Sequence, residues 1–209
     1  AGMPSPADGY EPMSPSALMD EMDVPAPTPP ASSECAPQNT ARFYVPNQIT
    51  PAAIGYFDIL FLPLGKDHPS AVPVEKRGVI LPPVIFDREA EAVKAELTQA
   101  LQSGICHLLI GNIGHLPLVQ AVVAACALQD KVTLHGDFRL NTANSPAAAR
   151  FLSLGFSDLI LSPELTLPRL RDISDAHVGR ASAVVYGRIP MMLLEKCAGR
   201  EAGDCKACE

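Results

Sequence analysis

Three cysteines near the end of the sequence have the spacing of a metal site. Cys197, Cys205 and Cys208 follow one another as Cys-x7-Cys-x2-Cys within the last 13 residues. A Cys-x2-Cys pair lets two thiolates reach one metal from a single tight turn, as in zinc and iron–sulfur sites. Such sites usually have four ligands, so we expect a fourth beyond Glu209. A redox-active pair and unconnected surface thiols are the alternatives that the spacing leaves open.

Polar side chains follow four consecutive predicted strands. In parallel β/α folds, functional groups collect where the strands end, at the carboxyl edge of the sheet. We therefore expect a ligand-facing site at this edge. For each single residue the alternative is a structural role, in which the side chain caps a helix or satisfies buried backbone groups. The candidates, in chain order, are Asn112, His135, Asp137, Asn141, Asn144, Glu164 and Arg188.

The sequence lacks the motifs that position two well-known hydrolytic sites. Ser162, His135 and Asp137 contain the three side-chain types of a serine-hydrolase triad. However, no Gly-x-Ser-x-Gly turn is present to place the serine. The His-Glu-x-x-His helix of zinc proteases is also absent. We therefore do not expect either type of catalysis.

Apolar runs and helical periods predict the elements that position these residues. Residues 57–64 and 78–85 are short apolar runs typical of buried strands, and Pro82 and Pro83 interrupt the second. After them, helix and strand alternate regularly. We expect helices at 88–102, 116–128, 145–154 (with Ser145 as N-cap) and 167–173, and strands at 107–111, 131–137, 158–161 and 181–186.

This alternation predicts the α/β fold class. Strands that are apolar along their whole length are buried on both faces, which is typical of a parallel sheet covered by helices. The regular part contains only five strands, whereas a closed barrel needs about eight. No Gly-x-Gly-x-x-Gly turn of the dinucleotide-binding folds follows a strand. We therefore predict an incomplete parallel β/α (TIM-like) barrel.

The beginning of the chain has a different composition. Nine prolines lie in the first 37 residues, among Ser, Ala and acidic residues, without a helical or strand period. Such a segment buries too little apolar surface to offset its chain entropy. We therefore predict a disordered Pro-rich linker at residues 1–40 and one β/α domain at 41–209. Because the chain starts at Ala1 and ends one residue after a cysteine, we expect sequence to be missing at both ends.

Composition limits the environment and partners of the chain. The formal net charge is −7 and no Lys/Arg run occurs, which argues against a strong nucleic-acid surface on this piece, although not against an RNA substrate. No apolar run approaches the length of about 18 residues that predicts a membrane helix. The clustering of cysteines at one end favours a metal site in a reducing cytoplasm over a secreted disulfide scaffold.

Three motifs together resemble the collagenase-like peptidase family U-32. They are the Gly-Asp-x-x-Leu-Asn loop at residues 136–141, the Leu-Ser-Pro-Glu-Leu strand end at 161–165, and the Tyr-Gly-Arg-x-Pro-x-Met segment at 186–192 that leads to Cys197. The similarity extends over roughly residues 57–208 and is strongest from His135 onward. It implies the C-terminal part of a β/α barrel, with the rest of the barrel missing from this chain.

The resemblance also implies a function. The family was named for proteolysis, whereas several of its bacterial branches carry out oxygen-independent hydroxylation of RNA bases or of a quinone precursor with an iron–sulfur cluster. It implies cluster ligands at Cys197, Cys205 and Cys208, most simply for a four-iron cluster. Catalytic roles are then expected for Asp137, Glu164 and Arg188, and substrate contacts for Asn112, His135, Asn141 and Asn144.

Three functional hypotheses follow. The first is an iron–sulfur hydroxylase that acts on an RNA base or a related ring. The second is a peptidase in which Glu164 or Asp137 activates water on a peptide substrate. The third is a non-catalytic fragment whose cysteines bind structural zinc. None of the three requires a membrane.

Overall fold

The fold is an open sheet of parallel strands, seen in a computed structural model that describes residues 38–190 and 193–194. Seven strands pair in the order β1-β2-β3-β4-β5-β6-β7, and every neighbouring pair is parallel. The strands are β1 Thr40–Arg42, β2 Ile59–Pro63, β3 Arg77–Ile80, β4 His107–Ile110, β5 Thr133–Gly136, β6 Asp158–Ile160 and β7 Ala181–Ser182. Strand order equals chain order, as in a β/α barrel.

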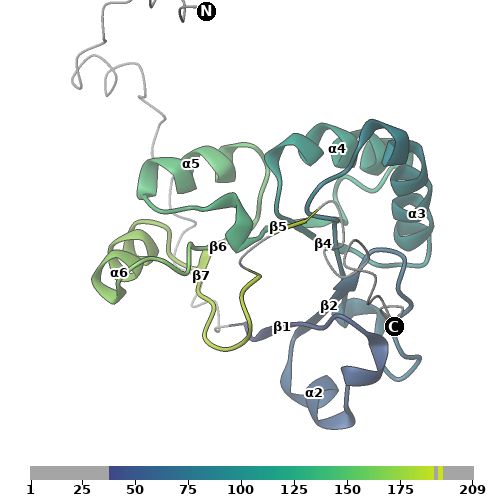
Figure 1. Cartoon of the computed structure of the whole chain (residues 1–209), viewed down its shortest axis with the longest axis horizontal. Helices are drawn as coiled ribbons and strands as arrows, with labels where there is room; N and C mark the ends of the chain where they lie inside the picture. The colour runs from purple at the N-terminus through teal and green to yellow at the C-terminus, as the bar shows by residue number, and fades with distance from the viewer. Residues whose placement is uncertain (1–37, 191–192, 195–209) are drawn as a thin grey trace, which may run out of the picture.

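Helices connect most of the strands and lie outside the curve of the sheet. The α-helices are α2 Pro51–Tyr56, α3 Ala90–Gln102, α4 Leu116–Ala125, α5 Ser145–Ser153 and α6 Leu167–Ala176. Short 3-10 helices are η1 Pro46–Gln48, η2 Val74–Lys76, η3 Asp87–Glu89, η4 Ile113–His115 and η5 Phe138–Leu140. Figure 1 shows the strands in an arc with α3, α4, α5 and α6 on its outer side.

Two layers of apolar side chains hold the curved sheet. Leu108 and Ile110 of β4 point outward and belong to the large core that the sheet forms with α3 and α4. Leu109, between them in the sequence, points inward and packs with Phe61 and Ile80 inside the curve. This alternation follows from the period of two along a strand, and burial of both layers explains why β4 is apolar along its whole length.

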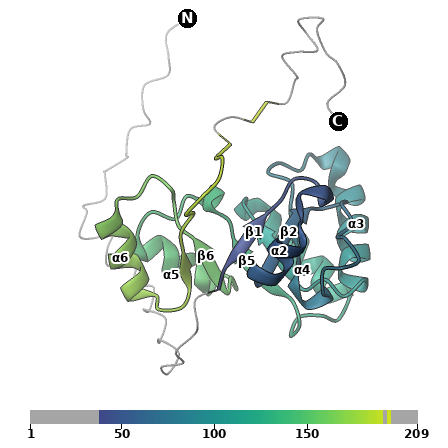
Figure 2. The ribbon, with the colours of Figure 1, turned by 90° about the horizontal axis from the view of Figure 1, so that it is seen from below.

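The arc of strands stays open between β1 and β7. These two strands are the ends of the sheet order and do not pair with each other. Residues 183–190 lie outside the sheet, and Figure 2 shows them extending away from β7. Its side chains Val185 and Tyr186 are 94% and 96% exposed. The prediction of an incomplete parallel β/α barrel is confirmed.

Some predicted boundaries were wrong for local reasons. The strand predicted at 78–85 ends at Ile80, shortly before Pro82 and Pro83, which have no N–H for strand pairing. The strand predicted at 181–186 ends at Ser182, because residues beyond it have no neighbouring strand in the described part of the chain. The N-cap of α5 is Asn144 rather than Ser145, and Asn144 Oδ1 accepts a hydrogen bond of 2.8 Å from Ala147 N.

The first strand was not predicted at all. β1 has only three residues, and its first residue, Thr40, falls inside the predicted linker of residues 1–40. It pairs with β2 through Thr40–Ile59, Ala41–Leu60 and Arg42–Phe61. Residues 1–37 lie outside the described part, so the predicted disorder of the linker stays a prediction.

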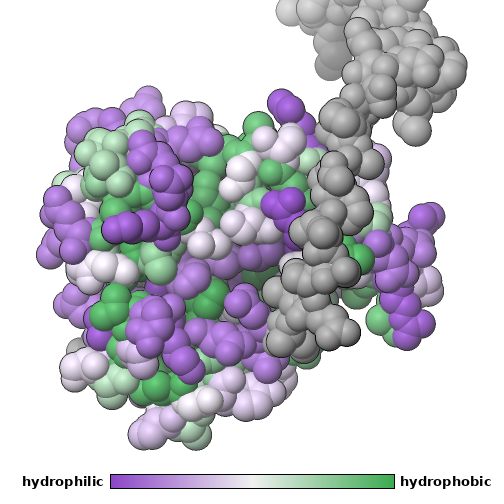
Figure 3. Space-filling model, turned by 180° about the vertical axis from the view of Figure 1, so that it is seen from behind, coloured by the Kyte–Doolittle hydropathy of each residue, from purple (hydrophilic) through white to green (hydrophobic). Residues whose placement is uncertain are grey.

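One face of the molecule has a mixed surface. On the face seen in Figure 3, polar residues predominate and apolar residues form patches between them. Within residues 38–190 and 193–194, every helix is too short or too polar to cross a membrane.

Candidate functional site

Asp137 lies at the carboxyl edge of the sheet, directly after β5, and is fully buried. Its backbone begins the 3-10 helix η5, and its Oδ1 accepts a hydrogen bond of 2.9 Å from Phe138 N. The same oxygen accepts a 2.6 Å hydrogen bond from a terminal guanidinium nitrogen of Arg42, the last residue of β1. The Asp137 side chain is 0% exposed and the Arg42 side chain 20% exposed. A buried ion pair therefore crosses the inside of the curve, between strands β1 and β5.

The second oxygen of Asp137 has no hydrogen-bond partner among the described residues. Oδ2 is buried, and a guanidinium nitrogen of Arg139 lies 3.7 Å from it, beyond ordinary hydrogen-bond distance. Gly111, at the end of β4, makes room for this arrangement. A Cβ atom at Gly111 would lie 3.0 Å from Asp137 Oδ2 and 3.1 Å from Arg139 Cβ. A larger residue at position 111 would therefore displace Asp137 Oδ2 or the Arg139 side chain, whereas glycine does not.

Burial and the two arginines act on Asp137 in opposite directions. Burial is the larger effect and raises the pKa of Asp137 above its ordinary value, because it disfavours the charged carboxylate. The charges of Arg42 and Arg139, and hydrogen bonds from Phe138 N and Arg42, lower the pKa of Asp137 in part. A carboxyl group held in this way can accept a hydrogen bond from a ligand through Oδ2, or donate one when it is protonated.

Phe138 joins the two arginines into one cluster. The guanidinium carbon of Arg42 lies 5.1 Å from the centre of the Phe138 ring, and that of Arg139 lies 5.8 Å from it. Both distances are within the range of cation–π attraction. We call Arg42, Asp137, Phe138 and Arg139 the carboxyl-edge cluster.

A second polar cluster lies inside the curve, nearer the beginning of the strands. His107 and Asp158 are the first residues of β4 and β6. His135 lies between them: its Nε2 is 3.0 Å from His107 Nδ1, and its Nδ1 is 2.7 Å from Asp158 Oδ2. The edge of the Phe61 ring packs against the His135 ring. We call His107, His135 and Asp158 the histidine cluster.

The histidine cluster accounts for the predicted residue His135. Both of its ring nitrogens are engaged, which leaves neither free for a substrate. It is bonded to Asp158 rather than to Asp137, and Ser162 Oγ instead accepts a bond from Glu164 N. The serine-hydrolase arrangement is therefore not formed. Among the described residues, no group of three His, Cys, Asp or Glu side chains is placed to hold a metal ion.

The three predicted asparagines have local structural roles. Asn112 is the N-cap of η4, where its Oδ1 accepts a 2.9 Å bond from Gly114 N, and its Nδ2 donates to Pro83 O. Asn144 caps α5. Asn141 ends η5 in the left-handed region at φ 51°, a conformation that asparagine tolerates better than most residues. These contacts explain the residue types without a substrate, and the substrate contacts predicted for them stay predictions.

Of the remaining predicted residues, the structure describes Glu164 and Arg188, and neither has a hydrogen bond or ion pair with Asp137. Glu164 and Arg188 are exposed, and their charged groups make no ion pair with another described residue. Cys197, Cys205 and Cys208 lie outside the described residues, so the predicted metal site is untested.

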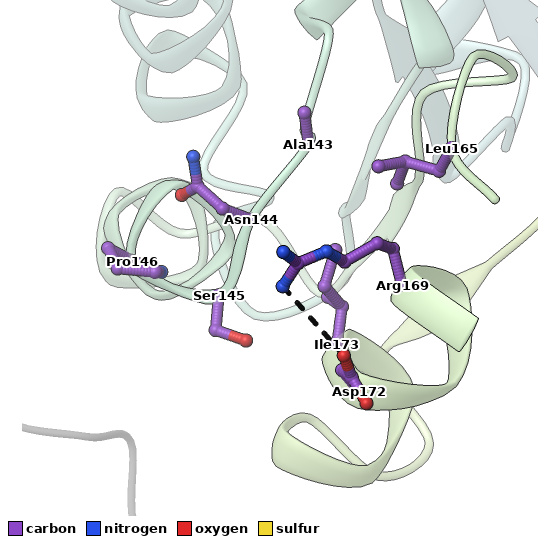
Figure 4. A pocket seen from close by; sticks show the side chains of 8 residues that line it. All are labelled: Ala143, Asn144, Ser145, Pro146, Leu165, Arg169, Asp172 and Ile173. Carbon is purple, nitrogen blue, oxygen red and sulfur yellow. Dashed lines mark ion pairs between the residues drawn. The ribbon is translucent and has the colours of Figure 1, made fainter. Parts of the chain in front are cut away.

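A shallow hollow of about 480 Å³ lies to the side of these clusters, between the start of α5 and the helix α6. Figure 4 shows Arg169 reaching into it from α6, with Asp172 beside it at 3.9 Å. Asn144 is the one predicted site residue in its lining. The Arg169 and Asp172 side chains are 74% and 68% exposed. This open hollow therefore lacks the buried polar groups of the carboxyl-edge cluster.

Arg42 is the site residue that the sequence did not reveal. It lies beside the Pro-rich stretch, in a strand too short to give an apolar run, and 95 residues separate it from Asp137. Arg139 belongs to the polar loop that follows β5, which is one of the strand ends where the sequence predicts functional side chains.

Comparison with known proteins identifies the family. The model of peptidase family U32 matches residues 75–204, more than half of the 209-residue chain. The match includes Asp137, Phe138 and Arg139 of the carboxyl-edge cluster but not Arg42. A search of curated proteins found no match. On the strength of the family match, and in agreement with the sequence motifs and the open β/α barrel, this chain belongs to peptidase family U32.

Proposed function

We propose that this chain is part of an iron–sulfur enzyme that hydroxylates an RNA base or a related planar ring without molecular oxygen. The observation that carries the proposal is the fully buried carboxyl group of Asp137 at the carboxyl edge of the sheet, one oxygen of which is unpaired within residues 38–190 and 193–194. In β/α barrels this edge is where substrates are bound and transformed. Buried polar atoms are normally paired, and an unpaired one at such an edge favours a ligand-binding role.

The sequence supplies residues that suit the cofactor. Cys197, Cys205 and Cys208 would hold the cluster, since cysteine thiolates are the usual ligands of iron–sulfur clusters. When bound, a four-iron cluster would supply single-electron transfer. The chain enters this segment from the carboxyl end of β7, and because all seven strands are parallel, that end belongs to the same edge as Asp137. This direction of the chain supports a cluster near the substrate.

The described residues would bind and orient the substrate. The unpaired Oδ2 of Asp137 would accept a hydrogen bond from an N–H or O–H of the ring, while Arg42 holds the other oxygen. The apolar side chains of Phe61, Ile80 and Leu109, which fill the inside of the curve, would keep water away from this contact. A desolvated hydrogen bond to a charged acceptor is stronger than one in water.

Anaerobic purification of the full chain tests this proposal. We expect a brown protein that contains iron and sulfide, with visible absorption that dithionite bleaches. The variant C205S should lose the colour, because it removes one proposed ligand. The variant C126S is the matched control, since Cys126 lies at the end of α4 and is not a proposed ligand. A colourless wild type that binds zinc instead would reject the proposal in favour of structural zinc, whose ligands are also thiolates.

Peptide hydrolysis is the second candidate, because the matched family is described as a peptidase family. Asp137 is already bonded to Arg42, whereas Glu164 is exposed and free of ion pairs with the described residues. A hydrolytic role would therefore fall on Glu164. Cleavage of gelatin that is lost in E164Q and kept in C208S would support peptidase activity and contradict the redox proposal.

A further inference from the structure

The carboxyl-edge cluster extends beyond the residues that define the family. The family match begins at residue 75, whereas Arg42 lies in β1, before it. Arg42 nevertheless makes the shortest contact to Asp137, at 2.6 Å. Strand β1 is held in place by β2, with Arg42 paired to Phe61 in the register of the sheet. Strands β1 and β2 therefore deliver a guanidinium to a site that otherwise consists of family-matched residues.

Arg42 and Arg139 have similar surroundings but differ in their contact with Asp137. They are similarly exposed, at 20% and 23%, and both lie over the Phe138 ring. Only Arg42 is within hydrogen-bond distance of the carboxylate, since Arg139 remains 3.7 Å from Oδ2. Charge-assisted hydrogen bonds fix geometry as well as charge, whereas an ion pair without such a bond mainly contributes its field. The two arginines are thus expected to differ in their control of Asp137.

We infer that Arg42 is the positioning residue of the site: it holds Oδ1 of Asp137 and keeps the carboxyl group turned so that Oδ2 remains free for a ligand. The contacts around Asp137 support this assignment. Among the described residues, Arg42 from β1 and Arg139 from η5 are the cations beside it, Phe138 N donates to Oδ1, and Gly111 has no Cβ that would crowd Oδ2. The role of Arg42 toward Asp137 does not depend on the proposed function. Only the identity of the ligand that Oδ2 binds rests on it.

The direction of the effect follows from the burial of Asp137. Burial raises the pKa of Asp137, and Arg42 opposes this rise through its charge and its hydrogen bond. Without Arg42, the effect of burial on the pKa of Asp137 is less strongly opposed. The pKa of Asp137 should therefore rise further in a variant that lacks Arg42. A merely structural arginine would change stability without this specific effect on one carboxyl group.

The test is an NMR titration of the Asp137 carboxyl carbon in the full chain, with carbon-13 in the aspartate side chains. The resonance is assigned by its absence in D137N. We expect R42M to raise its titration midpoint clearly, R139M to raise it less, and R42K to bring it back toward the wild-type value. If R42M does not fold, R42Q takes its place, because it removes the charge but keeps a polar side chain.

Two outcomes would overturn the inference: equal midpoints in wild type and R42M (or R42Q), or equal shifts in the Arg42 and Arg139 variants. The titration needs neither iron nor a substrate. A titration result that contradicts the role of Arg42 would therefore say nothing about the iron–sulfur proposal. A colourless protein, in turn, would contradict the iron–sulfur proposal without affecting the titration.

Discussion

The inside of the curved sheet holds two polar clusters that differ in how completely they are satisfied. In the histidine cluster, His135 uses both ring nitrogens, one toward His107 and one toward Asp158. In the carboxyl-edge cluster, Asp137 is more deeply buried, yet its Oδ2 has no hydrogen-bond partner in the part of the chain that the structure describes. Both clusters cost desolvation energy. Only the carboxyl-edge cluster contains a buried side-chain atom, Asp137 Oδ2, without a hydrogen-bond partner among the described residues.

This difference separates a structural cluster from a candidate site. The bonded chain His107–His135–Asp158 ties three neighbouring strands together and orders the interior. An unpaired buried oxygen weakens the fold unless a ligand compensates it. The position of each cluster agrees with this reading, because the unpaired oxygen lies at the carboxyl edge and the bonded chain begins at the opposite ends of β4 and β6.

The largest expected effect comes from breaking the Arg42–Asp137 pair. R42M leaves a buried carboxylate without its closest cation, and we expect it to lower the free energy of unfolding by about 1–3 kcal/mol. The double variant R42M/D137N should recover part of this loss, because it no longer buries an unpaired charge. Urea unfolding of the four proteins in the cycle measures the coupling. Strictly additive losses would show that the pair does not stabilise the fold.

The next effect comes from filling the space beside Asp137. In G111A the new methyl group would meet Asp137 Oδ2 at 3.0 Å and Arg139 Cβ at 3.1 Å. We expect a loss of about 1–2 kcal/mol, at the lower end of the cost of overpacking. The control is G55A in α2, where a Cβ would meet nothing within 4 Å. G55A should stabilise the protein by up to about 1 kcal/mol, because alanine is the better helix former. Equal stability changes in G111A and G55A would contradict a close contact between a Cβ at position 111 and Asp137 or Arg139.

The smallest effect is the opposite pH dependence of the two clusters. Burial, with a smaller contribution from His135, lowers the pKa of His107, so its stabilisation is lost as pH falls through that lowered value. The pKa of Asp137 is raised, so its stabilisation is present at acid pH and lost as pH rises through that raised value. H107Q should therefore flatten the fall in unfolding free energy below about pH 6.5, the ordinary pKa of histidine.

Urea unfolding of wild type and H107Q between neutral and mildly acid pH measures this slope. Burial also lowers the pKa of His115, which lies outside both clusters, so H115Q should flatten the same slope. D137N should not flatten this fall and should if anything steepen it, because it removes a contribution of the opposite sign. A slope in H107Q equal to that of wild type would mean that the histidine cluster does not contribute to the pH dependence.

Elements with a strong local pattern could be predicted from the sequence. The strands β4, β5 and β6 and the helix α4 lie within a few residues of their expected ranges. For β4 the reason is that burial on both faces imposes a continuous apolar run. Asp137 was correctly placed at a strand end. The boundaries failed where the deciding factor was a neighbour: β7 stops at Ser182 because it is the last strand of the described sheet.

Candidate site residues were harder to separate from caps. Asn112, Asn141 and Asn144 follow strands just as Asp137 does, but their side chains or backbone angles serve the local turns. Nothing in the spacing of these residues distinguishes a cap from a ligand, since both roles favour short polar side chains in the same loops. Burial distinguishes them, because Asp137 is 0% exposed while Asn141 and Asn144 lie at the surface.

The sequence by itself determined the fold class, the family and the position of Asp137, because each depends on residues close together in the chain. Only the tertiary structure decided that Arg42 holds Asp137, that His135 belongs to a bonded chain, and that Oδ2 is left unpaired. The physical reason is that the curl of the sheet brings β1 and β5 face to face, and no local pattern records a contact between residues 95 positions apart.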